Sequence, residues 1–212
     1  MSFHLPPSLQ SESHQAALKQ LDVYYTPEFG DPGYFTGTAF DGWDSNGSRT
    51  KDADRFTADD LVAVTFLSVR VKATGAYWLL GPRAEHYNAL LQAIGHDRDF
   101  ADVDGRDITP DSPVWILETE LRKLPGVGRT IASKLMARKR PRLVPIYDKV
   151  LGKVMGLDDG HWQPLNAALR ADDQALQSRL LELRAAANLP ESISALRVLD
   201  VIAWRDGKDA GL

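Results

Sequence analysis

LPGVG at residues 124–128 joins two segments whose apolar residues recur at helical spacing. Pro125 cannot continue the first segment as a helix, and the two glycines permit positive φ and a close approach of the backbone. Val127 can pack back between the two helices. The stretch therefore predicts a helix-turn-helix with a very tight corner over residues 115–138.

The N-terminus of the second predicted helix is suited to an anion. The first N–H groups of a helix have no partner within the helix, and the helix dipole makes this end positive. A phosphate oxygen can accept hydrogen bonds from such groups, and basic side chains that follow can reach a neighbouring phosphate. The contacts would not depend on nucleotide sequence. The residues expected to bind phosphate are Leu124, Gly126, Val127, Gly128, Arg129, Thr130, Lys134, Arg138, Lys139 and Arg140.

The basic residues of the chain are concentrated around this corner. The segment from Leu121 to Lys153 carries ten Lys or Arg and one acid, Asp148, whereas the rest of the chain carries fifteen basic and twenty-eight acidic residues. A basic segment within an acidic body indicates a surface that binds a polyanion, although the net charge of the whole chain is -4. Charge alone leaves open a solvated basic face without a ligand.

The remaining pattern predicts a mainly α fold, because strands do not alternate with helices as in a parallel sheet. Ser112 before Pro113 is typical of a helix start, and Thr57 before two acids is another. Helices are expected near residues 13–24, 57–71, 83–94, 112–121, 176–183 and 193–202. The expected regions are an N-terminal helix and aromatic, glycine-rich loop segment packed on the core (1–55), a compact helical domain (56–205) and a tail (206–212).

The composition excludes several kinds of site. The chain has no cysteine, so disulfides, thiolate zinc sites and cysteine-bound iron-sulfur clusters are excluded. Its histidines share no helical i, i+4 spacing, and we expect no metal site. The N-terminal residues lack the basic start and apolar run of a signal peptide, and no stretch approaches 18 apolar residues. We therefore expect a cytoplasmic protein without a membrane partner.

The corner resembles a known DNA-binding motif. Residues 124–128 match the typical form of the helix-hairpin-helix, which is Leu-Pro-Gly-Val-Gly followed by a basic residue and a helix with small residues. The resemblance implies DNA as the partner, bound mostly through its phosphates. It implies no cofactor, apart from a monovalent cation that hairpin carbonyls hold in some of these proteins.

The segment after the corner is similar to the helix-hairpin-helix DNA glycosylases of base-excision repair. A basic stretch, an extended Val144-Pro145-Ile146, an acid and a helix follow in the same order. The resemblance implies that Asp148 is catalytic, stabilising charge on the sugar of an extruded nucleotide and activating water. Thr130 stands where bifunctional members have the Schiff-base lysine, which implies a hydrolase without lyase activity unless Lys134 substitutes. Arg70 stands where the family often has a Gln that fills the gap left by the base, and its planar side chain could fill this gap or contact a DNA phosphate.

Two other functions stay open from the sequence. Asp148 after an extended segment can simply cap the next helix, in which case the chain is a DNA-binding module without catalysis. The acidic bulk of the chain could instead contact a basic protein partner, which would make it an interaction domain. The sequence does not indicate an oligomeric state.

Overall fold

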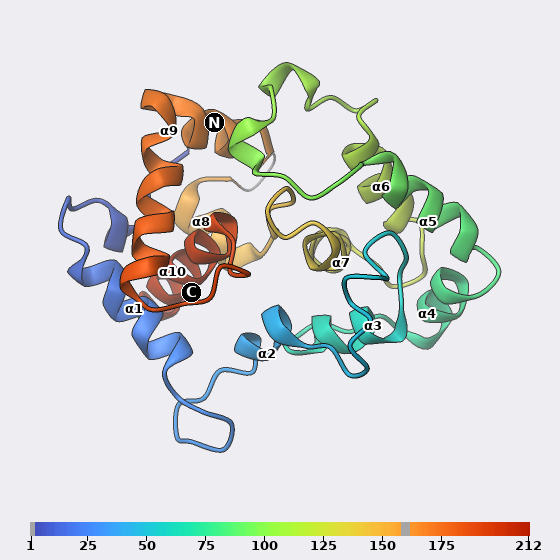
Figure 1. Ribbon diagram of the computed structural model, residues 1–212, viewed down its shortest axis with the longest axis horizontal. Helices are drawn as coiled ribbons and strands as arrows, with labels where there is room; N and C mark the ends of the chain where they lie inside the picture. The colour runs from blue at the N-terminus through green and yellow to red at the C-terminus, as the bar shows by residue number, and fades with distance from the viewer. Residues whose placement is uncertain (1–2, 158–161) are drawn as a thin grey trace. The chain divides into compact units, whose positions relative to one another are not determined.

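Helices dominate the computed structural model, which describes residues 3–157 and 162–212 (Figure 1). Within these residues there are ten α-helices and three short 3-10 helices, and there is no β-strand. The predicted mainly α class is confirmed. None of the helices in these ranges combines the length and the apolar character that a membrane span requires.

The chain divides into two units, each built from discontinuous segments. The terminal unit comprises Met1–Phe35, Asp99–Gly105 and Pro141–Leu212, and the corner unit comprises Thr36–Arg98 and Arg106–Arg140. The expected boundary at residue 55 differs from this division, because the first unit change along the chain lies after Phe35. The aromatic, glycine-rich segment is therefore shared between the two units.

The corner unit holds the LPGVG stretch between two of its helices. Its α-helices are α2 (Gly37–Gly42), α3 (Ala58–Thr65), α4 (Ala73–Leu80), α5 (Ala84–Ala93), α6 (Pro113–Leu121) and α7 (Arg129–Lys139). Helix α7 packs against α3 and α6, and α6 also packs against α5. Fully buried Leu117, Leu121 and Leu135 fill the space around α6 and α7. Burial of this apolar face is what fixes the two helices on either side of the corner.

Helix starts in this unit follow local side-chain chemistry. The Ser112 side chain accepts a hydrogen bond from the Trp115 N–H and caps α6, as predicted. At the start of α3, the Asp60 carboxylate accepts from the Thr57 N–H at 2.8 Å. The end of α3 was predicted less well, because the helix ends at Thr65 instead of continuing to residue 71. Ser68 has φ 60°, a left-handed conformation that no helix can contain.

The terminal unit is built around the last helix of the chain. Its α-helices are α1 (Gln15–Tyr25), α8 (Lys149–Met155), α9 (Trp162–Ala186, with non-helical backbone at 171–174) and α10 (Ala195–Asp209), and its 3-10 helices are η1 (Pro7–Leu9) and η2 (Phe100–Asp102). Helix α10 packs against α1, α8 and α9. The remaining 3-10 helix, η3 (Gly105–Asp107), lies where the chain passes from one unit to the other.

The predicted tail from residue 206 is wrong. Helix α10 continues to Asp209, and both Asp206 and Gly207 are buried. Asp206 accepts hydrogen bonds from the N–H and the hydroxyl of Ser8, at 2.8 and 2.5 Å. A Cβ on Gly207 would lie 2.3 Å from Val150 Cγ1, so only glycine allows α8 to approach this closely. The polar composition of the segment conceals these tertiary contacts.

Candidate functional site

The corner at residues 124–128 has the geometry that the sequence predicts. Helix α6 ends at Leu121, and the Val127 N–H donates to the Leu124 carbonyl at 3.0 Å before α7 begins at Arg129. Leu124 and Val127 are both buried, 2% and 4% exposed, because they pack back onto the helices. Gly126 has φ 78°, the positive value expected for one of the glycines.

The second glycine acts differently from the expectation. Gly128 has φ -93° and ψ -177°, so it caps α7 from the extended region and needs no left-handed backbone. It is exposed, and a Cβ placed on it would meet no atom within 4 Å. The space in front of the α7 N-terminus is therefore open. A glycine here leaves room for a ligand to approach the N–H groups of the first turn.

Lys72 lies beside the corner and was missed in the sequence. Its Cδ lies 2.8 Å from the position that a Cβ on Gly126 would occupy, and the residue is exposed. Gly75 places α4 here, because its Cβ position lies only 3.0 Å from the Pro125 carbonyl oxygen. Within the described residues the Lys72 ammonium forms no ion pair. The sole sequence signal for this contact is Gly75, a glycine within an apolar segment. Such a glycine indicates close packing but does not indicate which segment packs against it.

Other cations near the corner come from the end of α6 and the loop before α4. Arg122 and Lys123 are exposed and directly precede the corner, with Lys123 Nζ 2.5 Å from Glu120 Oε1. Arg70, expected from the resemblance to contact DNA, is also exposed. Together with Lys72, these residues leave a modest positive charge on the corner unit.

Four of the cations expected to bind phosphate are buried, three of them on α7 and the fourth directly after it. Lys134, Arg138, Lys139 and Arg140 are only 5%, 3%, 7% and 2% exposed. They bind other segments of the corner unit instead of facing solvent. Lys134 Nζ donates to the Leu67 carbonyl at 2.9 Å.

Two of these cations share one buried acid. Asp60 is 2% exposed, and its carboxylate lies 2.6 Å from Lys139 Nζ and 3.6 Å from Arg138 Nε. Burial, and after it the positive charge of Arg49, lowers the pKa of Arg138 to about 10 against the opposing effect of Asp60. Burial likewise lowers the pKa of Lys139, against the opposing effect of Asp60. Burial of two cations costs desolvation free energy, and the carboxylate of Asp60 offsets part of this cost.

The same cations hold the aromatic, glycine-rich segment onto the core. Arg138 Nη1 donates to the Phe40 carbonyl at 2.9 Å, and Lys139 Nζ donates to the Asp52 carbonyl at 3.0 Å. Arg140 Nη1 donates to the Ala53 carbonyl at 2.8 Å, and the same guanidinium pairs with Asp54. Since segments without regular structure leave carbonyls unsatisfied, these side chains complete the hydrogen bonding of the loop.

Arg129 and Thr130, at the start of α7, are half-buried. Arg129 Nε lies 3.9 Å from Oε1 of Glu118, an α6 residue that the sequence analysis did not single out. The Glu118 side chain is 9% exposed, and burial raises its pKa while Arg129 and then Arg122 lower it. A buried carboxylate therefore adjoins the open end of α7.

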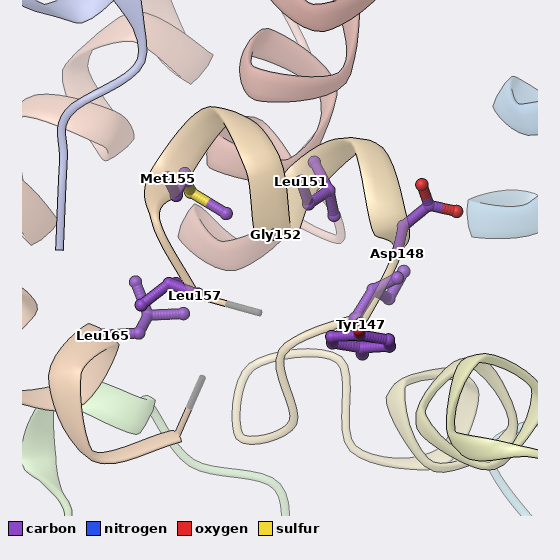
Figure 2. Close-up of a pocket in the computed structure, with 8 residues that line it drawn as sticks. Tyr147, Asp148, Leu151, Gly152, Met155, Leu157 and Leu165 are labelled. Atoms are coloured by element: carbon purple, nitrogen blue, oxygen red, sulfur yellow. The ribbon is translucent and has the colours of Figure 1, made fainter. Parts of the chain in front are cut away.

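Asp148 lies in the terminal unit at the N-terminus of α8, where the sequence predicts it. Its side chain accepts a hydrogen bond from the Val150 N–H at 2.9 Å, so it caps the helix. It borders a mainly apolar pocket. Figure 2 shows that its carboxylate points away from Leu157 and Leu165, which line the opposite side of the pocket. The residues that line this pocket are Ile146, Tyr147, Asp148, Leu151, Gly152, Met155, Leu157 and Leu165.

The fold and the corner define a mainly α protein with an open, glycine-capped helix start flanked by cations. The chain belongs to the family of unknown function DUF6308, whose model matches residues 17–207. No curated protein and no solved structure matches the chain. The family match includes the corner, α7 and Asp148, so it covers the candidate residues of both units.

Proposed function

We propose that the corner unit binds the DNA backbone, with a phosphate at the N-terminus of α7. The observation that carries this proposal is the open space in front of Gly128, at the start of a helix of 11 residues. The helix dipole favours an anion at this end, where the N–H groups of the first turn have no acceptor within the helix itself. Binding through backbone groups would not distinguish one nucleotide sequence from another.

The side chains around the corner support a weak, salt-sensitive contact. Lys72 and Arg122 are exposed next to it and can approach neighbouring phosphates. Because four cations on or directly after α7 are buried, fewer phosphates are neutralised than the basic composition suggests. Each phosphate contact contributes to the salt dependence of binding, so a small number of contacts gives a shallow dependence.

Gly128→Asp tests the phosphate site while preserving α7. Aspartate is a favoured N-cap, and the backbone of Gly128 has the extended conformation that a capping side chain needs. We expect α7 to be at least as stable in the variant, because the negative charge is favourable at a helix N-terminus. The same charge would repel phosphate. Fluorescence anisotropy with a labelled duplex should show an affinity loss of about tenfold or more.

Gly42→Asp is the matched control for this experiment. Gly42 lies at the end of α2 in the same unit, is exposed, and has nothing within 4 Å of its Cβ position. The substitution changes the net charge equally but away from the corner, and we expect it to change duplex affinity by less than about twofold. Equal affinities of Gly128→Asp and wild type would contradict the phosphate site.

A DNA glycosylase is the second candidate function, and the position of Asp148 favours it. Asp148 opens α8 after an extended segment, which is the place of the catalytic acid in the glycosylases that the chain resembles. Its carboxylate would stabilise charge on the sugar and activate water. Duplexes with deaminated, oxidised or alkylated bases, treated with alkali after incubation, should break for one lesion class. Asp148→Asn should retain the cap and lose the activity.

A further inference from the structure

Glu118 on α6 is a buried acid that the proposed DNA contact does not use. Its side chain is 9% exposed, and among the described residues its Oε1 atom accepts no hydrogen bond. A buried carboxylate oxygen without a donor is unfavourable for the folded state, because it loses its hydration without replacement.

The group nearest to this acid stands at the proposed phosphate site. Arg129 Nε lies 3.9 Å from Glu118 Oε1, beyond hydrogen-bond distance, and Arg129 is the first residue of α7 directly after Gly128. Arg122, directly after the helix that bears the acid, also acts on it electrostatically. From α5, the His86 and Tyr87 side chains contact Glu120 instead, at its carboxylate and its carbonyl. Arg129 is therefore the cation placed between the acid and the open end of α7.

We propose that Glu118 is a positioning residue that competes with a DNA phosphate for Arg129. When Glu118 is ionised, it holds Arg129 against α6. A phosphate at the N-terminus of α7 draws the guanidinium toward itself, and the carboxylate takes up a proton from solvent when it loses this partner. The inference rests on the proposed DNA contact and identifies proton uptake as its regulation.

The sign of the pH dependence follows from this linkage. Burial already raises the pKa of Glu118 in the free protein. Loss of Arg129 and arrival of a phosphate both disfavour the ionised form and raise the pKa further. The complex therefore binds more protons than the free protein, and duplex affinity should increase as pH falls toward the raised pKa. The limit is one proton, or about tenfold in affinity per pH unit.

Glu118→Gln tests the competition by removing the charge and keeping the shape. We expect this variant to bind a labelled duplex about three- to tenfold more tightly than wild type at neutral pH. Its affinity should vary less with pH between about 5 and about 8 than that of wild type. In an Arg129→Gln background, the same substitution should have no such effect. Glu120→Gln is the matched control, since this acid is also on α6 but partly exposed, and it should retain the wild-type pH profile.

Calorimetry of the wild-type protein provides a measurement that needs no variant. Titration with the duplex in two buffers of different ionisation enthalpy should reveal proton uptake on binding. No net uptake, or parallel pH profiles of wild type and Glu118→Gln, would overturn the role of Glu118 while leaving the DNA contact intact. Absence of duplex binding by wild type would instead overturn the DNA contact, and this inference with it.

Discussion

Glycine is present at the two positions of the corner for different physical reasons. Gly126 has φ 78°, where a side chain is strained, and Lys72 carbon atoms occupy the space next to it. Gly128 has an ordinary extended φ and open space. We expect Gly126→Ala to lower the free energy of unfolding by about 1–3 kcal/mol, and Gly128→Ala to change it by less than about 1 kcal/mol. Urea unfolding of both variants checks this prediction, and equal losses would contradict it.

Asp148 makes a separable contribution to stability. Its side chain caps α8 through the Val150 N–H. Asp148→Ala should lower the free energy of unfolding by about 1 kcal/mol, whereas Asp148→Asn should stay near wild type. Thermal unfolding of the two variants distinguishes these outcomes. Equal losses for Asn and Ala would mean that the charge of Asp148, and not its cap, stabilises the protein.

Residue-scale features with a local cause could be predicted from the sequence. Ser112, Thr57 and Asp148 all begin helices as expected, because a cap depends on groups only two or three residues away. Glu118 and Lys72 could not be identified in this way. Their importance comes from neighbours in other elements, which are Arg129 on α7 for the acid and Gly126 in the corner for the lysine.

At the scale of an element, α7 combines two functions along its length. Its N-terminus is open, whereas its C-terminal cations bind Asp60 and the carbonyls of the preceding loop segment. The sequence shows the same basic residues that a DNA-binding face would have. Burial could not be inferred from them, because the acceptors lie nearly a hundred residues away in the chain.

The buried end of α7 predicts a large effect on stability. Lys139→Met would leave Asp60 buried without its nearest cation, and we expect a loss of about 3–5 kcal/mol in the free energy of unfolding. Hydrogen exchange should also speed up in residues 43–56, since the Asp52 carbonyl loses its donor. Lys123→Met, on an exposed residue, should change stability by less than about 0.5 kcal/mol. Similar stabilities of the two variants would contradict the structural role.

At the scale of the whole molecule, the sequence predicts the helical class but not the division into units. Periodic apolar residues report that a segment is helical, and the helices expected near 13–24, 83–94 and 112–121 lie within two residues of their predicted limits. The helices expected near 57–71, 176–183 and 193–202 are present with different limits. The periodic residues do not report which helices pack together. The chain passes between the units after Phe35, Arg98, Gly105 and Arg140.

The positive charge available for binding also depends on which cations remain exposed in the folded protein. The basic segment has an excess of nine positive charges, yet four of its cations are buried in the corner unit. The DNA contact proposed for this unit therefore depends on backbone N–H groups and on a few exposed cations, chiefly Lys72 and Arg122. We expect about three phosphates to be neutralised, far fewer than the ten basic residues of the segment would allow.

The salt dependence of duplex affinity tests the central claim most directly. For three phosphate contacts, the logarithm of the wild-type association constant should fall with the logarithm of salt concentration with a slope of about -3, and Gly128→Asp should reduce the slope by about one. A wild-type affinity that is independent of salt, or identical slopes and affinities for the two proteins, would contradict a phosphate at the start of α7.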